Sequence, residues 1–139
     1  MTAVNAEEAK FLLDLANQAR DKAYAPYSNY KVGAVLRTKS GRVFTGVNVE
    51  NAAYPTTMCA ERIAIYKAVS EGEHEFAIIA VVTSNAGSPC GGCRQVMAEF
   101  GLDTIVLIAD GNGKLMQELT VNDLLPEAFT PRHLDNRKS

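Results

Sequence analysis

Hydrophobic residues recur at helical spacing near the start of the chain, and the pattern then changes to short apolar runs. Between residues 6 and 24 they form one stripe with polar residues on the other side, which predicts an amphipathic helix. The runs at 32–36 and 42–49 are predicted strands, and the Lys-Ser-Gly segment at 39–41 is predicted to be the turn between them. The chain therefore opens with a helix followed by a β-hairpin.

The second half alternates between helical and strand patterns. Helices are predicted at 59–69 and 91–100, and a glycine follows each of them, Gly72 and Gly101. The continuous apolar run at 76–83 is typical of a strand buried on both faces. Two further strands are predicted at 104–108 and 114–119, then a short helix at 121–125 capped by Thr120, then a polar tail at 132–139 that we expect to fray. This order predicts an α/β fold with one sheet of about five strands and helices on its faces.

Length and composition limit the class of protein. With 139 residues, 47% of them hydrophobic, the chain has the size of one domain, and we expect a single domain over 1–139 with a polar tail from about residue 130. No apolar run approaches the ~20 residues of a membrane span, and the start is acidic, so we expect a cytoplasmic protein without membrane contact. The net charge of −2 and the scattered Lys and Arg residues argue against nucleic acid and for a small ligand.

Three cysteines carry the candidate chemistry. Cys59 begins the tripeptide Cys-Ala-Glu, and Cys90 and Cys93 form a Cys-x-x-Cys pair. A structural zinc takes four protein ligands, whereas a hydrolytic zinc keeps one position free for water, so three cysteines indicate a catalytic zinc. A closed site would need His74 or His133, and neither has the short spacing to another ligand that such sites show. A thioredoxin-like redox pair is another alternative, which leaves the first cysteine unexplained.

Glu61 lies two residues after the first cysteine. A carboxylate there could accept and return the proton of a metal-held water. The alternative is a plain helix residue whose charge complements the helix dipole, for about 0.3–1 kcal/mol, and the two roles are compatible. Both cysteine motifs fall at predicted helix starts, where partial positive charge favours thiolates over thiols.

The cysteine motifs match the (His/Cys)-x-Glu and Pro-Cys-x-x-Cys signature of the zinc nucleobase deaminases. Other segments resemble the small tetrameric cytidine deaminases of pyrimidine salvage, namely Ala-Pro-Tyr-Ser at 25–28, Val-Gly-Ala at 32–34, Gly-Val-Asn-Val-Glu-Asn-Ala at 46–52 and Leu-Leu-Pro-Glu-Ala-Phe at 124–129. The resemblance implies a three-layer α-β-α fold around a mixed sheet. It also implies hydrolytic deamination of cytidine and deoxycytidine to uridine and deoxyuridine.

The resemblance further implies roles at the metal. The three cysteines would hold one zinc ion per subunit, and Glu61 would move protons between the attacking water, N3 of the base and the departing ammonia. Backbone around Ala60 would hold the base edge. Three thiolates leave Zn²⁺ with one net negative charge, and Arg62 is the position from which the family donates hydrogen bonds to them. An exposed surface cation is the alternative for Arg62.

Asn48 and Glu50 alternate near a strand end, so their side chains point the same way. The resemblance implies that they hold the ribose hydroxyl; an ordinary exposed strand face is the alternative. Tyr30 stands where many relatives have phenylalanine lining the pocket, and its added hydroxyl needs a partner if buried. Phe129 resembles the aromatic that stacks on the base in a neighbour's site, and Tyr54 lies in a loop that crosses the subunit boundary. We therefore expect a homotetramer with shared active sites.

Three other interpretations stay open. A blasticidin-type or otherwise altered deaminase shares the zinc motif, which determines the chemistry and not the substrate. RNA or DNA editing uses the same chemistry, but the acidic balance argues against it. A non-enzymatic module could use the cysteines to join two helices, and Glu61 distinguishes it from an enzyme. We also interpret three tyrosines as packing residues and both histidines as surface residues, namely Tyr24, Tyr27, Tyr66, His74 and His133.

Overall fold

The computed structural model describes residues 4–138 of the chain, with side chains up to residue 134. Its elements are α1 (Ala6–Arg20), β1 (Gly33–Thr38), β2 (Val43–Val47), the 3₁₀ helix η1 (Tyr54–Thr56), α2 (Ala60–Ser70), β3 (Phe76–Val82), α3 (Gly91–Glu99), β4 (Ile105–Ala109), β5 (Leu115–Thr120), α4 (Val121–Leu124) and the 3₁₀ helix η2 (Pro131–Lys138). Every helix and strand predicted from the periodicity is present, with ends that shift by a few residues.

The five strands form one mixed sheet in the order β2-β1-β3-β4-β5. β3 and β4 are parallel, and the other neighbouring pairs are antiparallel. The parallel pair needs a crossover, and α3 supplies it. The hairpin between β1 and β2 turns at Gly41, whose φ of 98° suits a residue without a side chain. The predicted sheet of about five strands is confirmed.

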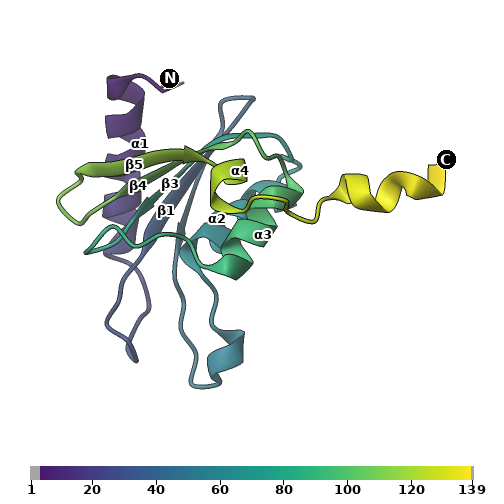
Figure 1. Ribbon diagram of the computed structural model, residues 1–139. Helices are drawn as coiled ribbons and strands as arrows, with labels where there is room; N and C mark the ends of the chain where they lie inside the picture. The colour runs from purple at the N-terminus through teal and green to yellow at the C-terminus, as the bar shows by residue number, and fades with distance from the viewer. Residues whose placement is uncertain (1–3, 139) are drawn as a thin grey trace.

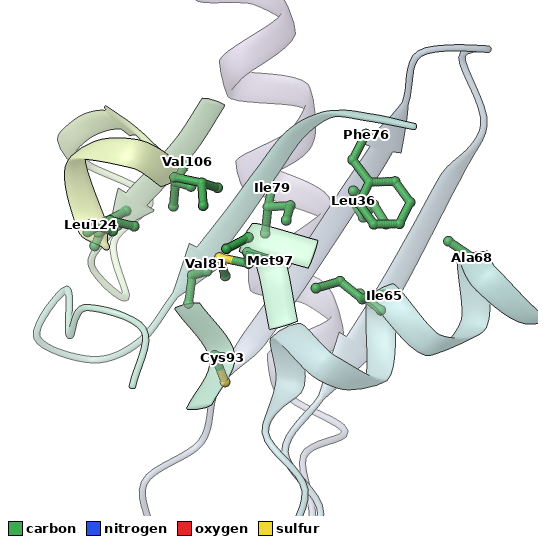
Figure 2. Packing of buried hydrophobic residues seen from close by; sticks show 14 of the residues in the cluster. Leu36, Ile65, Ala68, Phe76, Ile79, Val81, Cys93, Met97, Val106 and Leu124 are labelled. Atoms are coloured by element: carbon green, nitrogen blue, oxygen red, sulfur yellow. The ribbon is translucent and has the colours of Figure 1, made fainter. Parts of the chain in front are cut away.

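Helices cover both faces of the sheet, as the arrangement of α1, α2 and α3 around it shows (Figure 1). Alternate residues of β1 point to opposite sides: Val35 packs in a cluster with Leu12 and Ala16 of α1, while Leu36 packs in a second cluster with helices α2 and α3. Figure 2 shows the second cluster, with Leu36 near Phe76 and with Ile65 of α2 on the same side of the sheet. The three-layer α-β-α architecture is therefore confirmed.

The first helix ends at Arg20, four residues earlier than predicted. The reason is tertiary, because the backbone of Tyr24 pairs with the strand end that follows β2. Its N–H donates to the Asn48 carbonyl at 3.0 Å, and its carbonyl accepts from the N–H of Glu50 at 2.8 Å. A residue paired with an extended segment in this way cannot continue the helix.

One other expectation fails, and one stays a prediction. The fraying of the polar tail stays a prediction, and residues 131–138 form η2, which extends away from the sheet and its helices (Figure 1). Its first turn is held by His133, whose Nδ1 accepts from the N–H of Thr130 at 3.0 Å. Ser139 lies outside the described residues. Tyr24, Tyr27 and Tyr66 are 56%, 62% and 45% exposed, so interpreting them as packing residues is wrong for the single chain. His74 and His133 are exposed, as predicted.

Candidate active site

The three cysteines meet where two helices begin. Cys59 is the N-cap of α2, Cys90 is the N-cap of α3, and Cys93 lies in the first turn of α3. Glycine at position 46 of β2 permits this, because a side chain there would collide with the carbonyl of Ala60 at the start of α2. β2 can thus lie directly against the helix that carries the first cysteine.

The sulfur atoms are spaced as a zinc site requires. The Sγ atoms of Cys59 and Cys90 are 3.8 Å apart, those of Cys90 and Cys93 are 3.3 Å apart, and all three lie within 4.8 Å of one another. A tetrahedral zinc with bonds of about 2.3 Å needs sulfurs about 3.8 Å apart, so the cluster fits the metal. Among residues 4–134, neither histidine joins this cluster. The geometry agrees with three protein ligands and a free fourth position, not with a closed structural site.

The surroundings of the thiols favour an anion at Cys59. Hydrogen bonds from the Cys93 thiol and from Arg62 lower the pKa of Cys59 to about 5, although burial opposes the shift. The same hydrogen bond with Cys59, together with burial, raises the pKa of Cys93. The Nη2 of Arg62 lies 3.4 Å from the Cys59 sulfur, and its pKa is raised by the hydrogen bonds to Cys93 and Cys59. Arg62 is half-buried against the cluster, so it is not an ordinary surface cation.

Glu61 is a buried carboxyl group, only 5% exposed, in the first turn of α2. Burial raises its pKa to about 7, because a carboxylate loses hydration there; the nearby Cys59 thiolate adds to the shift, while its backbone hydrogen bond and Arg62 oppose it. A plain helix-capping glutamate would be solvated, with an ordinary pKa. Such a group is poised to hold or release a proton near neutral pH, as a general acid and base must.

A cavity of about 320 Å³ connects the thiol cluster with the predicted nucleoside-binding residues. Eight of the residues singled out by the sequence line it, namely Tyr30, Asn48, Glu50, Tyr54, Cys59, Ala60, Glu61 and Cys90. Cys93 lies in the apolar cluster beneath, where Figure 2 shows it beside Val81 and Met97. The segment that carries Asn48 and Glu50 reaches the cavity because Val49 pairs with Met58, just before Cys59, through two backbone hydrogen bonds of 2.9 and 3.0 Å.

The side chain of Asn48 makes two hydrogen bonds to the backbone of its own chain. Its side-chain oxygen accepts from the N–H of Val32 at 2.9 Å, and its amide donates to the carbonyl of Tyr30 at 2.9 Å. An asparagine amide offers two donors and two lone pairs, so one donor and one lone pair stay free for a ligand. The residue is buried, in contrast to an ordinary exposed strand face.

Glu50 is held as a carboxylate by the turn that precedes β1. One carboxylate oxygen accepts from the N–H groups of Tyr27 and Ser28, at 3.0 and 3.1 Å, and the other is in very close contact with the Ser28 hydroxyl. The hydroxyl of Ser28 is the main cause of the lowered pKa of Glu50. The side chain is therefore preorganised as an acceptor at the wall of the cavity.

Phe129 is the predicted substrate-binding residue that the single chain does not bring to the cavity. It is 57% exposed, it stacks on His133 with 5.4 Å between ring centroids, and its carbonyl accepts from the side chain of Gln95 at 2.8 Å. Tyr54 lines the cavity, although it is 82% exposed. The role of Phe129 in another subunit's site stays a prediction.

Arg94 was missed by the sequence analysis. Its guanidinium donates to the Pro89 carbonyl at 2.8 Å, to the Ser88 hydroxyl at 2.8 Å and to the Leu124 carbonyl at 2.7 Å. It thereby ties the segment before Cys90 to the end of α4. The position of Arg94 directly after Cys93 could have indicated a role at the site. Its partner Leu124 is thirty residues away in sequence, so the spacing of the motif could not identify that contact.

Comparisons with known proteins agree with this site. The family model described as "Cytidine and deoxycytidylate deaminase zinc-binding region" matches residues 6–109. The chain belongs to this family, and its three cysteines are placed to hold the zinc. It is 48% identical to a cytidine deaminase of Halalkalibacterium halodurans over 93% of this chain and 99% of that one. The crystal structure of cytidine deaminase from Burkholderia pseudomallei covers 91% of this chain and 100% of its own, with 46% identity and a TM-score of 0.82.

One relative has a different substrate in its name. A blasticidin-S deaminase of Bacillus cereus is 36% identical over 85% of this chain and 91% of its own. Shared zinc chemistry in the family therefore does not by itself identify the substrate. In the part of the chain that the structure describes, no helix is long and apolar enough to cross a membrane.

Proposed function

We propose that this protein hydrolyses cytidine and deoxycytidine to uridine and deoxyuridine, with release of ammonia, in pyrimidine salvage. The observation that carries the proposal is the buried carboxyl group of Glu61, which lines the same cavity as the thiols of Cys59 and Cys90. A zinc module that only joins two helices needs no buried proton-transfer group beside a cavity. The relative from Halalkalibacterium halodurans named cytidine deaminase, 48% identical to this chain, supports the same reaction.

In the reaction, a water oxygen forms a bond to C4 of the base and the bond from C4 to the amino nitrogen breaks. Bound zinc supplies Lewis-acid activation of that water. Glu61 takes a proton from the water, delivers it to N3, and later helps the amino group leave as ammonia. A carboxyl group with a pKa near 7 suits both directions of transfer. Arg62 offsets the excess negative charge of three thiolates, and backbone near Ala60 holds the edge of the base.

The cavity favours a neutral nucleoside over a nucleotide. Among the described residues, those that line it include no lysine, arginine or histidine, and Glu50 places a carboxylate in the wall. A 5′-phosphate entering such a cavity would lose hydration without gaining a cationic partner. Asn48 and Glu50 instead offer the donor and acceptors that sugar hydroxyls require, with Tyr30 as a neighbouring wall.

We further propose a cytoplasmic homotetramer with one zinc per subunit, in which residues 1–139 form one domain. Exposed Phe129 and Tyr54 support shared sites, since an aromatic ring left in water gains by entering a neighbour's cavity. The three free cysteines suit a reducing compartment. The combination of an acidic wall and a small cavity argues against RNA or DNA as substrate.

The test follows the ultraviolet absorbance of purified zinc-loaded protein with cytidine, deoxycytidine, cytosine and CMP, beside a Glu61→Ala variant. We expect rapid loss of the two nucleosides, little reaction of cytosine or CMP, and a zinc-containing but nearly inactive variant. Blasticidin S is included because of the relative named for it. Turnover of blasticidin S without turnover of cytidine would replace the proposed substrate, and normal turnover by the Glu61→Ala protein would refute the mechanism.

A further inference from the structure

Tyr30 and Asn85 join two walls of the cavity. Tyr30 lies in the turn before β1, and Asn85 lies in the segment between β3 and Cys90. The Tyr30 hydroxyl donates to the side-chain oxygen of Asn85 at 2.7 Å, across fifty-five residues of sequence. This interaction, the Tyr30–Asn85 link, is a contact that phenylalanine at position 30 could not make.

Each end of the link belongs to a turn with its own hydrogen bonds. On one side, the N–H of Tyr30 donates to the Ser28 hydroxyl at 3.0 Å, and that hydroxyl contacts Glu50. On the other side, the Asn85 oxygen also accepts from Thr83 at 3.4 Å, and the Thr83 hydroxyl accepts from the N–H of Gly87 at 2.7 Å. The link therefore connects the turn that orients Glu50 with the opposite wall of the cavity.

Each turn contains a residue that is not glycine but has a left-handed backbone conformation. Asn29, directly before Tyr30, has a φ of 57°, and Ala86, directly after Asn85, has a φ of 58°. This conformation costs roughly 1–2 kcal/mol for a residue such as alanine, so contacts within and between the turns must hold it. A hydrogen bond between the two turns is one such contact.

Gly87 leaves the room that the link needs. A Cβ atom at this position would collide with the Tyr30 hydroxyl, while its backbone conformation is one that alanine can adopt. Replacing Gly87 by alanine should therefore push the hydroxyl away from Asn85. The same change should matter less when the hydroxyl is absent.

The segment just before Cys90 is held by contacts other than the link. Arg94 fixes the Ser88 and Pro89 segment separately, through its bonds to the Ser88 hydroxyl and the Pro89 carbonyl. Loss of the link should therefore loosen the wall around Glu50 without displacing a metal ligand. Substrate binding should respond, and zinc content and the chemical step should not.

We propose that the Tyr30–Asn85 link is a positioning element for the nucleoside, and that Tyr30 and Asn85 determine substrate affinity together rather than separately. The inference rests on the proposed function, since the nucleoside is its ligand. Tyr30 acts on the nucleoside indirectly, because its hydroxyl helps to position Glu50 and the opposite wall of the cavity. From the sequence, this hydroxyl was only a departure from the phenylalanine that many relatives have.

The test compares Tyr30→Phe, Asn85→Ala and the double variant by steady-state kinetics with cytidine, by zinc content per chain, and by calorimetric affinity for uridine, the product. We expect each single variant to raise KM by about three- to tenfold, the loss of one net hydrogen bond, with kcat and zinc unchanged. The double variant should be no worse than either single one. Tyr66→Phe, which removes a hydroxyl from the exposed face of α2, is the matched control.

Gly87→Ala gives an independent measurement. We expect it to raise KM in the wild-type background and to change KM little in the Tyr30→Phe background. Three results would each refute the positioning role of the link. They are an unchanged KM and uridine affinity in Tyr30→Phe, additive effects in the double variant, and a loss of zinc. Failure of the wild-type protein to deaminate cytidine would instead reject the proposed function, and is recognised before any variant is measured.

Discussion

Arg94→Lys is expected to weaken both the fold and the retention of zinc. The guanidinium bridges the Pro89 carbonyl, the Ser88 hydroxyl and the Leu124 carbonyl, and a single ammonium group on a shorter reach cannot serve acceptors on two separate segments. We expect about two of the three hydrogen bonds to be lost. At roughly 1–1.5 kcal/mol each for half-buried bonds, the free energy of unfolding should fall by about 2–3 kcal/mol.

Thermal unfolding and chelator competition measure this effect. For a chain of this size, about 2–3 kcal/mol corresponds to a Tm lower by roughly 6–10 °C. The segment before Cys90 should also become mobile, so the variant should lose zinc faster to a competing chelator than the wild type does. Because the charge is kept, the loss would come from the geometry of the guanidinium and not from electrostatics.

Arg42→Lys is the matched control, because Arg42 also makes several bonds, but from an exposed guanidinium, to the exposed carboxylate of Glu71 at 2.8 Å and the half-buried carboxylate of Glu73 at 3.4 Å. Exposed ion pairs contribute about 0–1 kcal/mol, so this variant should stay close to the wild type in Tm and zinc retention. The reasoning is refuted if Arg94→Lys behaves like the wild type, or if Arg42→Lys loses as much stability and zinc.

Three further outcomes are expected. Glu61→Gln keeps the shape of the buried side chain but cannot transfer protons, so kcat should fall by about 10²- to 10⁴-fold with zinc retained; turnover near the wild-type value contradicts the role. Removing the metal with a chelator should lower Tm, because the thiols of Cys59 and Cys90 are then no longer joined, and added zinc should restore it; an unchanged Tm speaks against a zinc that supports the fold. Phe129→Ala should abolish most cytidine turnover, and mixing it with Glu61→Ala protein should recover part of it if subunits share sites; the absence of recovery in mixed oligomers argues that each chain works alone.

The chemistry of the metal site was determined by short stretches of sequence. Cys59 and Glu61 are two positions apart, Cys90 and Cys93 are three apart, and both pairs begin helices whose periodicity is visible in the chain. Local spacing of this kind survives in any fold that keeps the helices. The ligand types, the proton-transfer group and the alternation of helices and strands could therefore be predicted before the structure was considered.

Other features required the tertiary structure. The link between Tyr30 and Asn85 and the bond from Arg94 to Leu124 join residues far apart in the chain, and no periodicity relates them. The same holds for the end of α1, which stops because the backbone of Tyr24 pairs with the segment after β2. The sequence could identify Phe129 only by resemblance. In the structure, Phe129 lies away from the cavity of its own chain.

The physical reason is the range of the interactions. Secondary structure and metal-ligand spacing follow from neighbours within one or two turns of the chain, whose geometry is set by covalent bonds and local hydrogen bonds. The burial that raises the pKa of Glu61, and the two backbone partners that occupy the Asn48 side chain, arise only when distant segments pack together. The sequence by itself determined which atoms are available for catalysis, and tertiary packing decided which of them are buried, oriented and joined.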